Sequence, residues 1–250
     1  MDQLADDINR STKVSFSDTL DTKATPNNWK KESNQIFGEL QTRHVWQNLN
    51  EAGLLPSLTD DLTFISPTAN YPTHEITLYK DEVAKRHGKT IFLVGDISDI
   101  DPNPMIKDAQ LVQDINHRFQ YFKWDANKLP LSQENTTANV IWDRKGWLYY
   151  IGQAWIMGSV EERKQLLLNT LNQYHDLLAP KGVVVIDAIN EKQLQFESST
   201  TSVLTANFGQ EIWDEISDKF LWQDLGEGAE RIRVLVKKDK SESEKVLQSE

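Results

Sequence analysis

Three aspartates come directly after apolar, strand-like segments, which is where an α/β sheet places its ligands. They are Asp96, Asp125 and Asp143. A carboxylate in such a place can accept hydrogen bonds from both hydroxyls of a ribose, and an acid after the next strand can accept from an adenine amino group. The structural alternative stays open, because aspartate commonly ends a strand and caps the following helix.

The segment that begins at Asp143 carries further candidates for binding and catalysis. Asp143 could orient a nucleophile or accept its proton, Arg144 could pair with an acidic substrate, and Trp147 and Tyr150 could form the wall of a pocket. The alternative is packing, with the aromatic side chains under a surface loop and the basic ones in solvent.

Several other chemistries lack the residues that they need. The 250-residue chain has no cysteine and no HxH or HExxH pattern, so the sequence predicts no metal site. It also lacks GxGxxG and GxxxxGK[ST] motifs for nucleotide phosphates. A formal net charge of -11 argues against nucleic acid as a partner. No apolar run is long enough to span a membrane, and the acidic amino terminus resembles no secretion signal, so we expect a cytoplasmic protein.

Alternating strand-like and helix-like segments must position these residues. Strands are expected at 62–65, 90–94, 119–124, 138–142 and 183–186, with a final hairpin of 221–225 and 232–236. Helices are expected from Ser33 to Gly53, after residue 73, after Asn103, from a capping box at Ser159, and around Ile212, Trp213, Ile216 and Phe220. This alternation predicts an α/β fold with a doubly wound, mostly parallel sheet and an antiparallel C-terminal hairpin.

The chain divides into four parts by composition. Residues 1–32 are predicted to be a flexible N-terminal segment, 33–59 a helical extension, 60–237 the α/β domain, and 238–250 a disordered, charged tail.

The α/β part resembles the class I S-adenosylmethionine-dependent methyltransferases over several pieces in the same order. The pieces are LVGDIS at 93–98, WDANKLPL at 124–131, TANVI at 137–141 and LLAPKGVVVI at 177–186. The resemblance implies a seven-stranded sheet and S-adenosylmethionine as cofactor. It places the ribose at Asp96 with Ile97 and the adenine at Asp125 with Ala126, and it puts a small-molecule substrate over residues 143–150.

The loop after the first strand departs from that family. The family has a glycine-rich loop there, but residues 65–75 read ISPTANYPTHE and contain no glycine. One hypothesis is that Ser66, Thr68 and Asn70 hold the cofactor through their side chains, in an enzyme that methylates a small molecule. The other is that Tyr71 and two prolines close the site, which leaves a non-catalytic module that binds or regulates a protein partner.

Overall fold

The computed structural model describes residues 32–69, 72–96, 103–123, 137–144, 146–153, 158–188, 199–226 and 231–238. Within these ranges, no helix is long and apolar enough to cross a membrane.

Seven strands form one sheet in the order β3-β2-β1-β4-β5-β7-β6. Their bounds are β1 Leu62–Ser66, β2 Thr90–Asp96, β3 His117–Lys123, β4 Ala138–Trp142, β5 Leu178–Ala188, β6 Phe220–Leu225 and β7 Ile232–Lys237. The pairs among β1 to β5 are parallel, whereas β7 runs antiparallel to both β5 and β6. The predicted doubly wound, mostly parallel sheet with an antiparallel C-terminal hairpin is confirmed.

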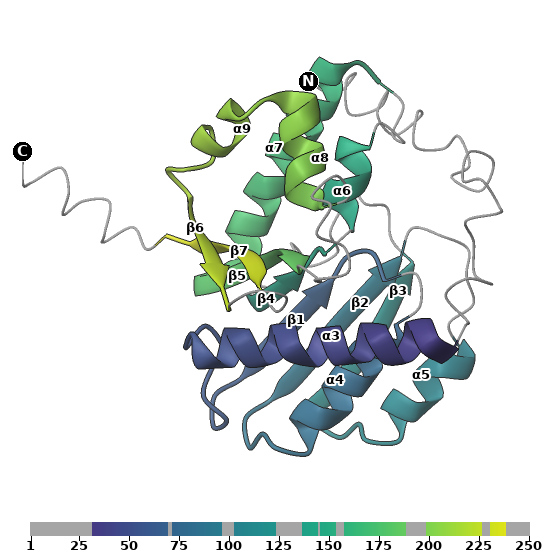
Figure 1. Ribbon diagram of the computed structural model, residues 1–250. Helices are drawn as coiled ribbons and strands as arrows, with labels where there is room; N and C mark the ends of the chain where they lie inside the picture. Colours follow the sequence, from purple (N-terminus) through teal and green to yellow (C-terminus); the bar gives the residue numbers. More distant parts are fainter. Residues whose placement is uncertain are drawn as a thin grey trace, which may run out of the picture.

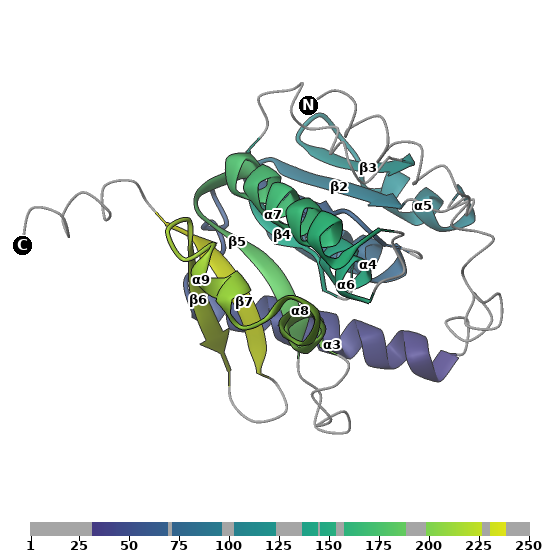
Figure 2. The same ribbon diagram turned by 90° about the horizontal axis from the view of Figure 1, so that it is seen from above.

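Helices cover both faces of the sheet (Figure 1). On one face lie α3 Glu32–Glu51, α4 Thr73–Val83 and α5 Asn103–Gln110; on the other lie α6 Trp147–Gly152, α7 Val160–Leu177, α8 Thr200–Phe208 and α9 Glu211–Asp214. Seen from above, α7 and α3 lie on opposite sides of the strands (Figure 2). Consecutive strand residues therefore face different cores: Phe64 packs with α3 and α4, and Ile65 with α6 and α7. This is why the inner strands are apolar without alternation.

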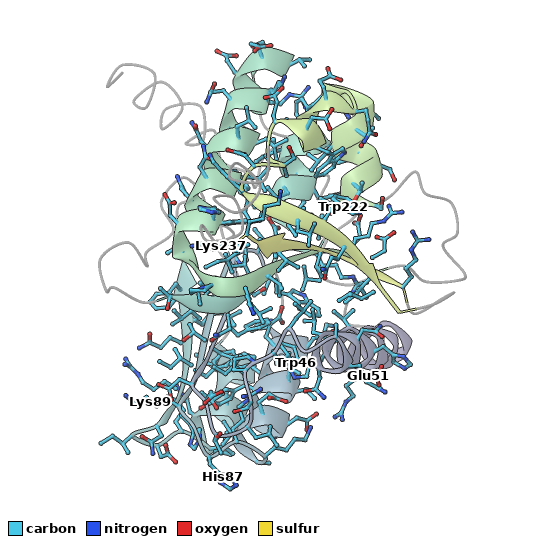
Figure 3. The ribbon with its side chains drawn as sticks, turned by 90° about the vertical axis from the view of Figure 1, so that its left-hand side faces the viewer. Trp46, Glu51, His87, Lys89, Trp222 and Lys237 are labelled. Atoms are coloured by element: carbon cyan, nitrogen blue, oxygen red, sulfur yellow. The ribbon has the colours of Figure 1, made fainter. Side chains whose placement is uncertain are left out.

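The N-terminal helix α3 packs into the same core as α4. Trp46 lies between α3 and the sheet (Figure 3), and its ring contacts Phe64 edge to face at 6.0 Å. Its indole Nε1 donates to Glu82 Oε1 at 2.9 Å, and Glu82 also forms a buried ion pair with Arg86 at 2.7 Å. The helix ends at Glu51, and Gly53, the glycine expected to stop it, follows with a φ of 66° that suits glycine.

Two sequence predictions about the C-terminal half need correction. Strand β5 begins at Leu178, five residues before the predicted start, because Leu178 already pairs with Ala138 of β4. The helix predicted around Ile212, Trp213, Ile216 and Phe220 is present but shorter, because α9 contains Ile212 and Trp213 and ends at Asp214. Gly209, at a φ of 84°, separates α8 from the short α9, and Phe220 is the first residue of β6.

Candidate functional site

The order of the strands reverses between β1 and β4, since β2 and β3 lie on one side of β1 while β4 and β5 lie on the other. In parallel α/β sheets, ligands bind beyond the carboxyl ends of the strands at such a reversal. Asp143 follows β4 at this edge, Ser66 ends β1, and Asp187 lies near the end of β5.

The loop after β1 is held against the end of β2. The main-chain N–H of Ala69 donates to the carbonyl oxygen of Gly95 at 2.8 Å, and the side chain of Ala69 is buried. Thr68 lies in the chain between the end of β1 and Ala69. Its hydroxyl oxygen is buried and has no hydrogen-bond partner among the residues that the structure describes.

Ser66 turns its side chain toward α4. Its hydroxyl donates to Glu75 Oε1 at 3.2 Å, and both residues are buried. Glu75 lies in the first turn of α4, where the helix dipole favours a negative charge. The Ser66 hydroxyl is thus already engaged within the protein.

Asp143 is fully buried beneath the short helix α6. Its Oδ2 accepts from Tyr174 Oη at 2.8 Å and from the main-chain N–H of Leu148 at 3.2 Å. Burial raises the pKa of Asp143 to about 7, although the hydrogen bonds from Tyr174 and Leu148 act in the opposite direction. The other oxygen, Oδ1, has no hydrogen-bond partner among the described residues.

Gly146 allows the loop after β1 to approach the turn after β4. A Cβ on Gly146 would lie 2.1 Å from Asp143 Oδ1 and 2.3 Å from Thr68 Oγ1, closer than any real Cβ contact. Only glycine leaves room for both oxygens here. Gly146 was not among the predicted site residues, because nothing in the local sequence pattern indicates a contact with a distant loop.

Arg144 lies among acidic side chains. It is half-buried, and burial lowers the pKa of its guanidinium to about 10, whereas the negative charges of Asp187 and Glu75 act to raise it. A substrate carboxylate that binds Arg144 would therefore compete with Asp187 and Glu75, which already interact electrostatically with the same guanidinium.

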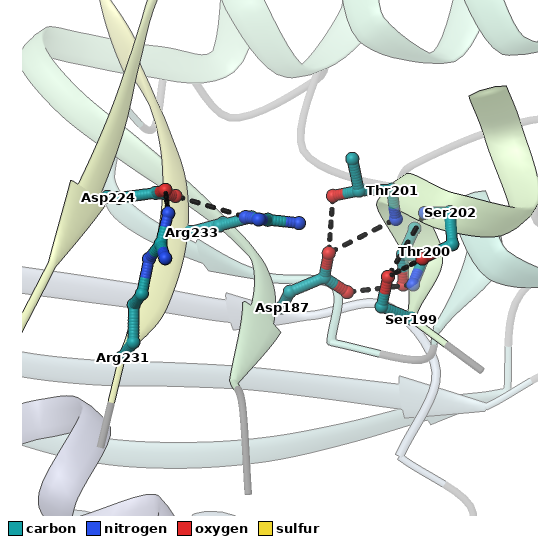
Figure 4. Close-up of polar contacts among 8 residues, drawn as sticks. All are labelled: Asp187, Ser199, Thr200, Thr201, Ser202, Asp224, Arg231 and Arg233. Carbon is teal, nitrogen blue, oxygen red and sulfur yellow. Dashed lines mark hydrogen bonds and ion pairs between the residues drawn. The ribbon is translucent and has the colours of Figure 1, made fainter. Parts of the chain in front are cut away.

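Asp187 is a strand-end acid that the sequence analysis missed. It is 3% exposed and accepts from the main-chain N–H groups of Thr200 and Thr201 at 2.7 and 3.1 Å, and from the Thr201 hydroxyl (Figure 4). Its position just after the predicted strand 183–186 is the same signal that identified the other three acids.

The two aromatic candidates differ in exposure. Trp147 is 2% exposed, packs in the core on the α7 side of the sheet and donates from Nε1 to Thr170 Oγ1 at 3.3 Å. Tyr150 is half-buried and packs against the same core cluster. Trp147 therefore packs in the core, which was the alternative to its forming the wall of a pocket.

Other predicted site residues lie beyond what the structure describes. Asn70, Ile97, Asp125 and Ala126 are outside the described residues, as is Tyr71. Asp96 is the last residue of β2, and its backbone pairs with that of Lys123 in β3. Among the described residues, no group of three or more His, Cys, Asp or Glu side chains could hold a metal ion.

No known family model matches the sequence, and no curated protein is significantly similar to it. The structure resembles a Listeria monocytogenes protein provisionally assigned as a class I S-adenosylmethionine-dependent methyltransferase. The TM-score is 0.50 and the identity 12%, over 78% of this chain and 59% of that one. This chain thus spans about three fifths of the Listeria protein.

Two further similar structures are methyltransferases solved with bound S-adenosylhomocysteine. The plantazolicin methyltransferase BpumL gives a TM-score of 0.47 at 11% identity, over 95% of this chain and all of that one. The magnesium protoporphyrin IX methyltransferase of Synechocystis gives 0.43 at 12% identity, over 81% and 84%. What the Listeria match establishes is the fold: the chain has the class I methyltransferase fold.

Proposed function

We propose that this protein is an S-adenosylmethionine-dependent methyltransferase that acts on a small molecule. The observation that carries the proposal is the reversal of strand order between β1 and β4, within a class I methyltransferase fold, with polar side chains at the carboxyl ends of the strands.

The residues at this edge fit a cofactor with a ribose and an amino-acid portion. The cofactor would supply a methyl group on a positively charged sulfur. Asp96 at the end of β2 offers a carboxylate for the ribose hydroxyls, and the buried Thr68 hydroxyl offers an unused polar atom in the loop after β1. The other candidates for binding the cofactor are Ser66, Asn70, Ile97, Asp125 and Ala126.

The turn after β4 is the candidate for binding the methyl acceptor. Methyl transfer depends mainly on aligning the nucleophile with the methyl group, so few acids or bases are needed. In this proposal Arg144 and Tyr150 contact the acceptor, and Trp147 supports them from the core. Asp143 Oδ1 is the atom available to orient the nucleophile or to take its proton.

A second candidate function, a non-catalytic binding or regulatory module, is favoured by the loop after β1. Pro67 and Ala69 are buried there, and the Ala69–Gly95 hydrogen bond holds the loop on the end of β2. A loop without glycine that packs in this way leaves less backbone free to approach a cofactor. The same fold would then serve to bind a protein partner.

Calorimetric titration with S-adenosylmethionine and S-adenosylhomocysteine distinguishes the two. We expect both to bind, and Asp96→Ala to weaken binding by roughly 1–3 kcal/mol, because it removes an acceptor for two hydroxyls. Asp125→Ala should have the smaller effect, since one amino-group contact is lost.

Asp218→Ala is the matched control, because Asp218 is exposed in the turn before β6 and away from the carboxyl ends of the parallel strands. If neither ligand gives a heat of binding or a thermal shift at saturating concentration, the enzyme hypothesis is refuted and the non-catalytic binding module is favoured.

A further inference from the structure

Three of the five large apolar side chains that are exposed in the described part of the chain gather at one end of the molecule. Leu111 and Ile115, in the connection from α5 to β3, are 83% and 91% exposed. Leu58, in the connection from α3 to β1, is 49% exposed. The other two are Val160 on α7 and Leu221 on β6. Apolar side chains gathered on a surface mark an interaction site, whereas scattered ones are ordinary.

The connections that carry these side chains lie side by side at the amino ends of β1, β2 and β3. The carbonyl oxygen of Leu58 accepts from the main-chain N–H of His87 at 2.8 Å, and that of Asn116 accepts from Thr90 at 2.9 Å. We call the exposed residues of these segments the amino-end surface. They are residues 57–61, 84–89 and 107–118.

The amino-end surface is at the edge of the sheet opposite to the candidate site. The site lies beyond the carboxyl ends of the parallel strands, whereas these segments precede β1, β2 and β3. Figure 3 shows His87 and Lys89 in the lower part of the molecule, away from the green helices of the other layer. A partner bound at the amino-end surface therefore leaves the site open.

Long basic side chains surround the exposed apolar ones. They are Lys85, Lys89, Lys107 and Arg118, all exposed. None of the four side chains has an ion pair or a hydrogen bond among the described residues. Lysine and arginine carry the charge at the end of a flexible stem, so the charge can extend from the surface while the stem covers apolar groups.

The acidic side chains of the same surface are four aspartates, which are too short to extend as far. Three of them accept hydrogen bonds from their own or the adjacent loop: Asp60 from the Ser57 hydroxyl at 2.7 Å, Asp61 from the Lys89 main-chain N–H at 2.9 Å, and Asp114 from that of Asn116 at 2.7 Å. The fourth is Asp108. Positive and negative charges are thus equal in number here, in a chain whose formal net charge is -11. An anionic partner meets less repulsion at this surface than the whole chain would give, and the long basic side chains reach it first.

We propose that the amino-end surface docks the protein on an anionic phospholipid membrane, with Leu111 and Ile115 inserted among the head groups and the basic side chains at the lipid phosphates. Apolar side chains that stand out almost fully from a loop can enter the boundary between head groups and acyl chains. Lysine and arginine near an anionic membrane add to the attraction. A symmetric contact with a second copy would instead bring the basic side chains of the two copies together.

Co-sedimentation of the full chain with vesicles tests the proposal. One set of vesicles contains phosphatidylcholine alone, and the other contains phosphatidylcholine and phosphatidylserine. We expect the mixed vesicles to bind at least about tenfold more tightly, and this preference to weaken as salt is added. Equal binding to both sets, or no binding to the mixed set, would overturn the proposal.

The apolar contribution is measured with Leu111→Ser combined with Ile115→Ser. We expect the affinity for mixed vesicles to fall at least about tenfold, because two apolar side chains no longer leave water. Val160→Ser combined with Leu221→Ser is the matched control, since these side chains are 51% and 47% exposed elsewhere on the molecule. Its affinity should equal that of the wild type, and an equal loss in both double variants would refute the surface.

The basic contribution is measured with Lys85→Gln combined with Lys89→Gln. We expect at least about fivefold weaker binding to mixed vesicles, with a smaller dependence on salt. The control Lys164→Gln combined with Lys238→Gln removes the same charge from α7 and from the residue after β7. If the control loses as much affinity, net charge alone decides binding and the proposed orientation is wrong.

A label at the apolar tip reports insertion directly. The chain has no cysteine, so Ile115→Cys carries an environment-sensitive NBD fluorophore at one place only. With mixed vesicles we expect its emission to become stronger and to shift to shorter wavelength, whereas the same label on Val160→Cys should not respond. A label at Ile115→Cys that stays in water while the protein is bound to vesicles would exclude insertion.

Sedimentation equilibrium without lipid separates membrane docking from self-association. We expect the wild type to be monomeric. A dimer that Leu111→Ser with Ile115→Ser abolishes would assign the surface to a second copy and overturn the proposal. None of these measurements uses a cofactor or a residue of the candidate site, so their outcome is independent of the proposed methyltransferase activity.

Discussion

Asp143 and Asp187 each stabilise the start of the helix that follows their strand. Asp143 accepts from the backbone of α6, and Asp187 accepts from the first two amides of α8. A carboxylate at a helix start satisfies N–H groups that have no partner within the helix. An acid just after a strand can therefore hold the local backbone together as well as bind a ligand.

At the residue scale, we predict that Gly146→Ala destabilises the protein by roughly 1–3 kcal/mol, as overpacking does in a close-packed interior. The added methyl would overlap Asp143 Oδ1 and Thr68 Oγ1, and neither belongs to the far end of a flexible side chain. Urea unfolding measures the loss. Gly146→Ala combined with Thr68→Ala should recover part of it, because one of the two overlaps is removed. A Gly146→Ala protein of wild-type stability would contradict the close approach.

A second residue-scale prediction concerns the Tyr79 hydroxyl, which is buried without a hydrogen-bond partner among the described residues. The ring packs against Phe92 and Phe119, and burial is the main cause that raises the pKa of Tyr79 to about 12. Tyr79→Phe keeps the ring and removes an unsatisfied group, so we expect a change of about 0–1 kcal/mol in the stabilising direction.

Tyr174→Phe is the contrasting variant, because the Tyr174 hydroxyl donates to Asp143. It should lose roughly 1–3 kcal/mol in the same denaturation experiment. If Tyr79→Phe were the more damaging of the two, the Tyr79 hydroxyl must have a partner, such as a buried water bridging it to Thr90 and His117, which also carry unpaired buried atoms.

At the element scale, the start of β5 contains a residue in an unfavourable conformation. Lys181 has a φ of 60°, in the left-handed region that favours glycine, and it is exposed. The register of β5 against β4 shifts at this place, between the pairs Ala138–Leu178 and Val140–Val183. We predict that Lys181→Gly stabilises the protein by about 1 kcal/mol.

Thermal and urea unfolding check this, with Lys181→Ala as the control. Alanine keeps the Cβ that causes the strain, so it should give no comparable gain. An equal gain from both substitutions would mean that loss of the lysine side chain, and not relief of backbone strain, is responsible.

At the scale of the whole molecule, the two cores share the same strands, so we expect them to unfold together. Trp46 reports on the α3 and α4 side, and Trp147 on the side of α6 and α7. In β4, Val140 faces the first core and its neighbour Ile141 the second. If either core unfolds, one face of the shared sheet loses the helices that bury its apolar side chains.

The prediction is a single urea midpoint for both faces. It is measured by the difference in fluorescence between the wild type and Trp46→Phe, and between the wild type and Trp147→Phe. Coincident transitions indicate one cooperative unit. Two midpoints, with the Trp46 signal lost first, would show instead that α3 is a separable extension.

The sequence by itself determined the features that depend on neighbours a few residues apart. The capping box at Ser159 is present, with Glu162 accepting from the Ser159 main-chain N–H at 2.7 Å. The β4 segment has its predicted bounds, and the final hairpin is antiparallel. These features are readable because periodicity, caps and turns act within one turn of helix or one hairpin.

Only the tertiary structure decided which of these segments meet. The order of the strands brings the loop after β1 to Gly146 and places Arg144 where the charges of Glu75 and Asp187 act on it. The early start of β5 likewise depends on its pairing with Ala138 of β4. Such contacts join residues tens of positions apart, and the free energy that selects them comes from burying both faces of one sheet, which no local pattern of residues records.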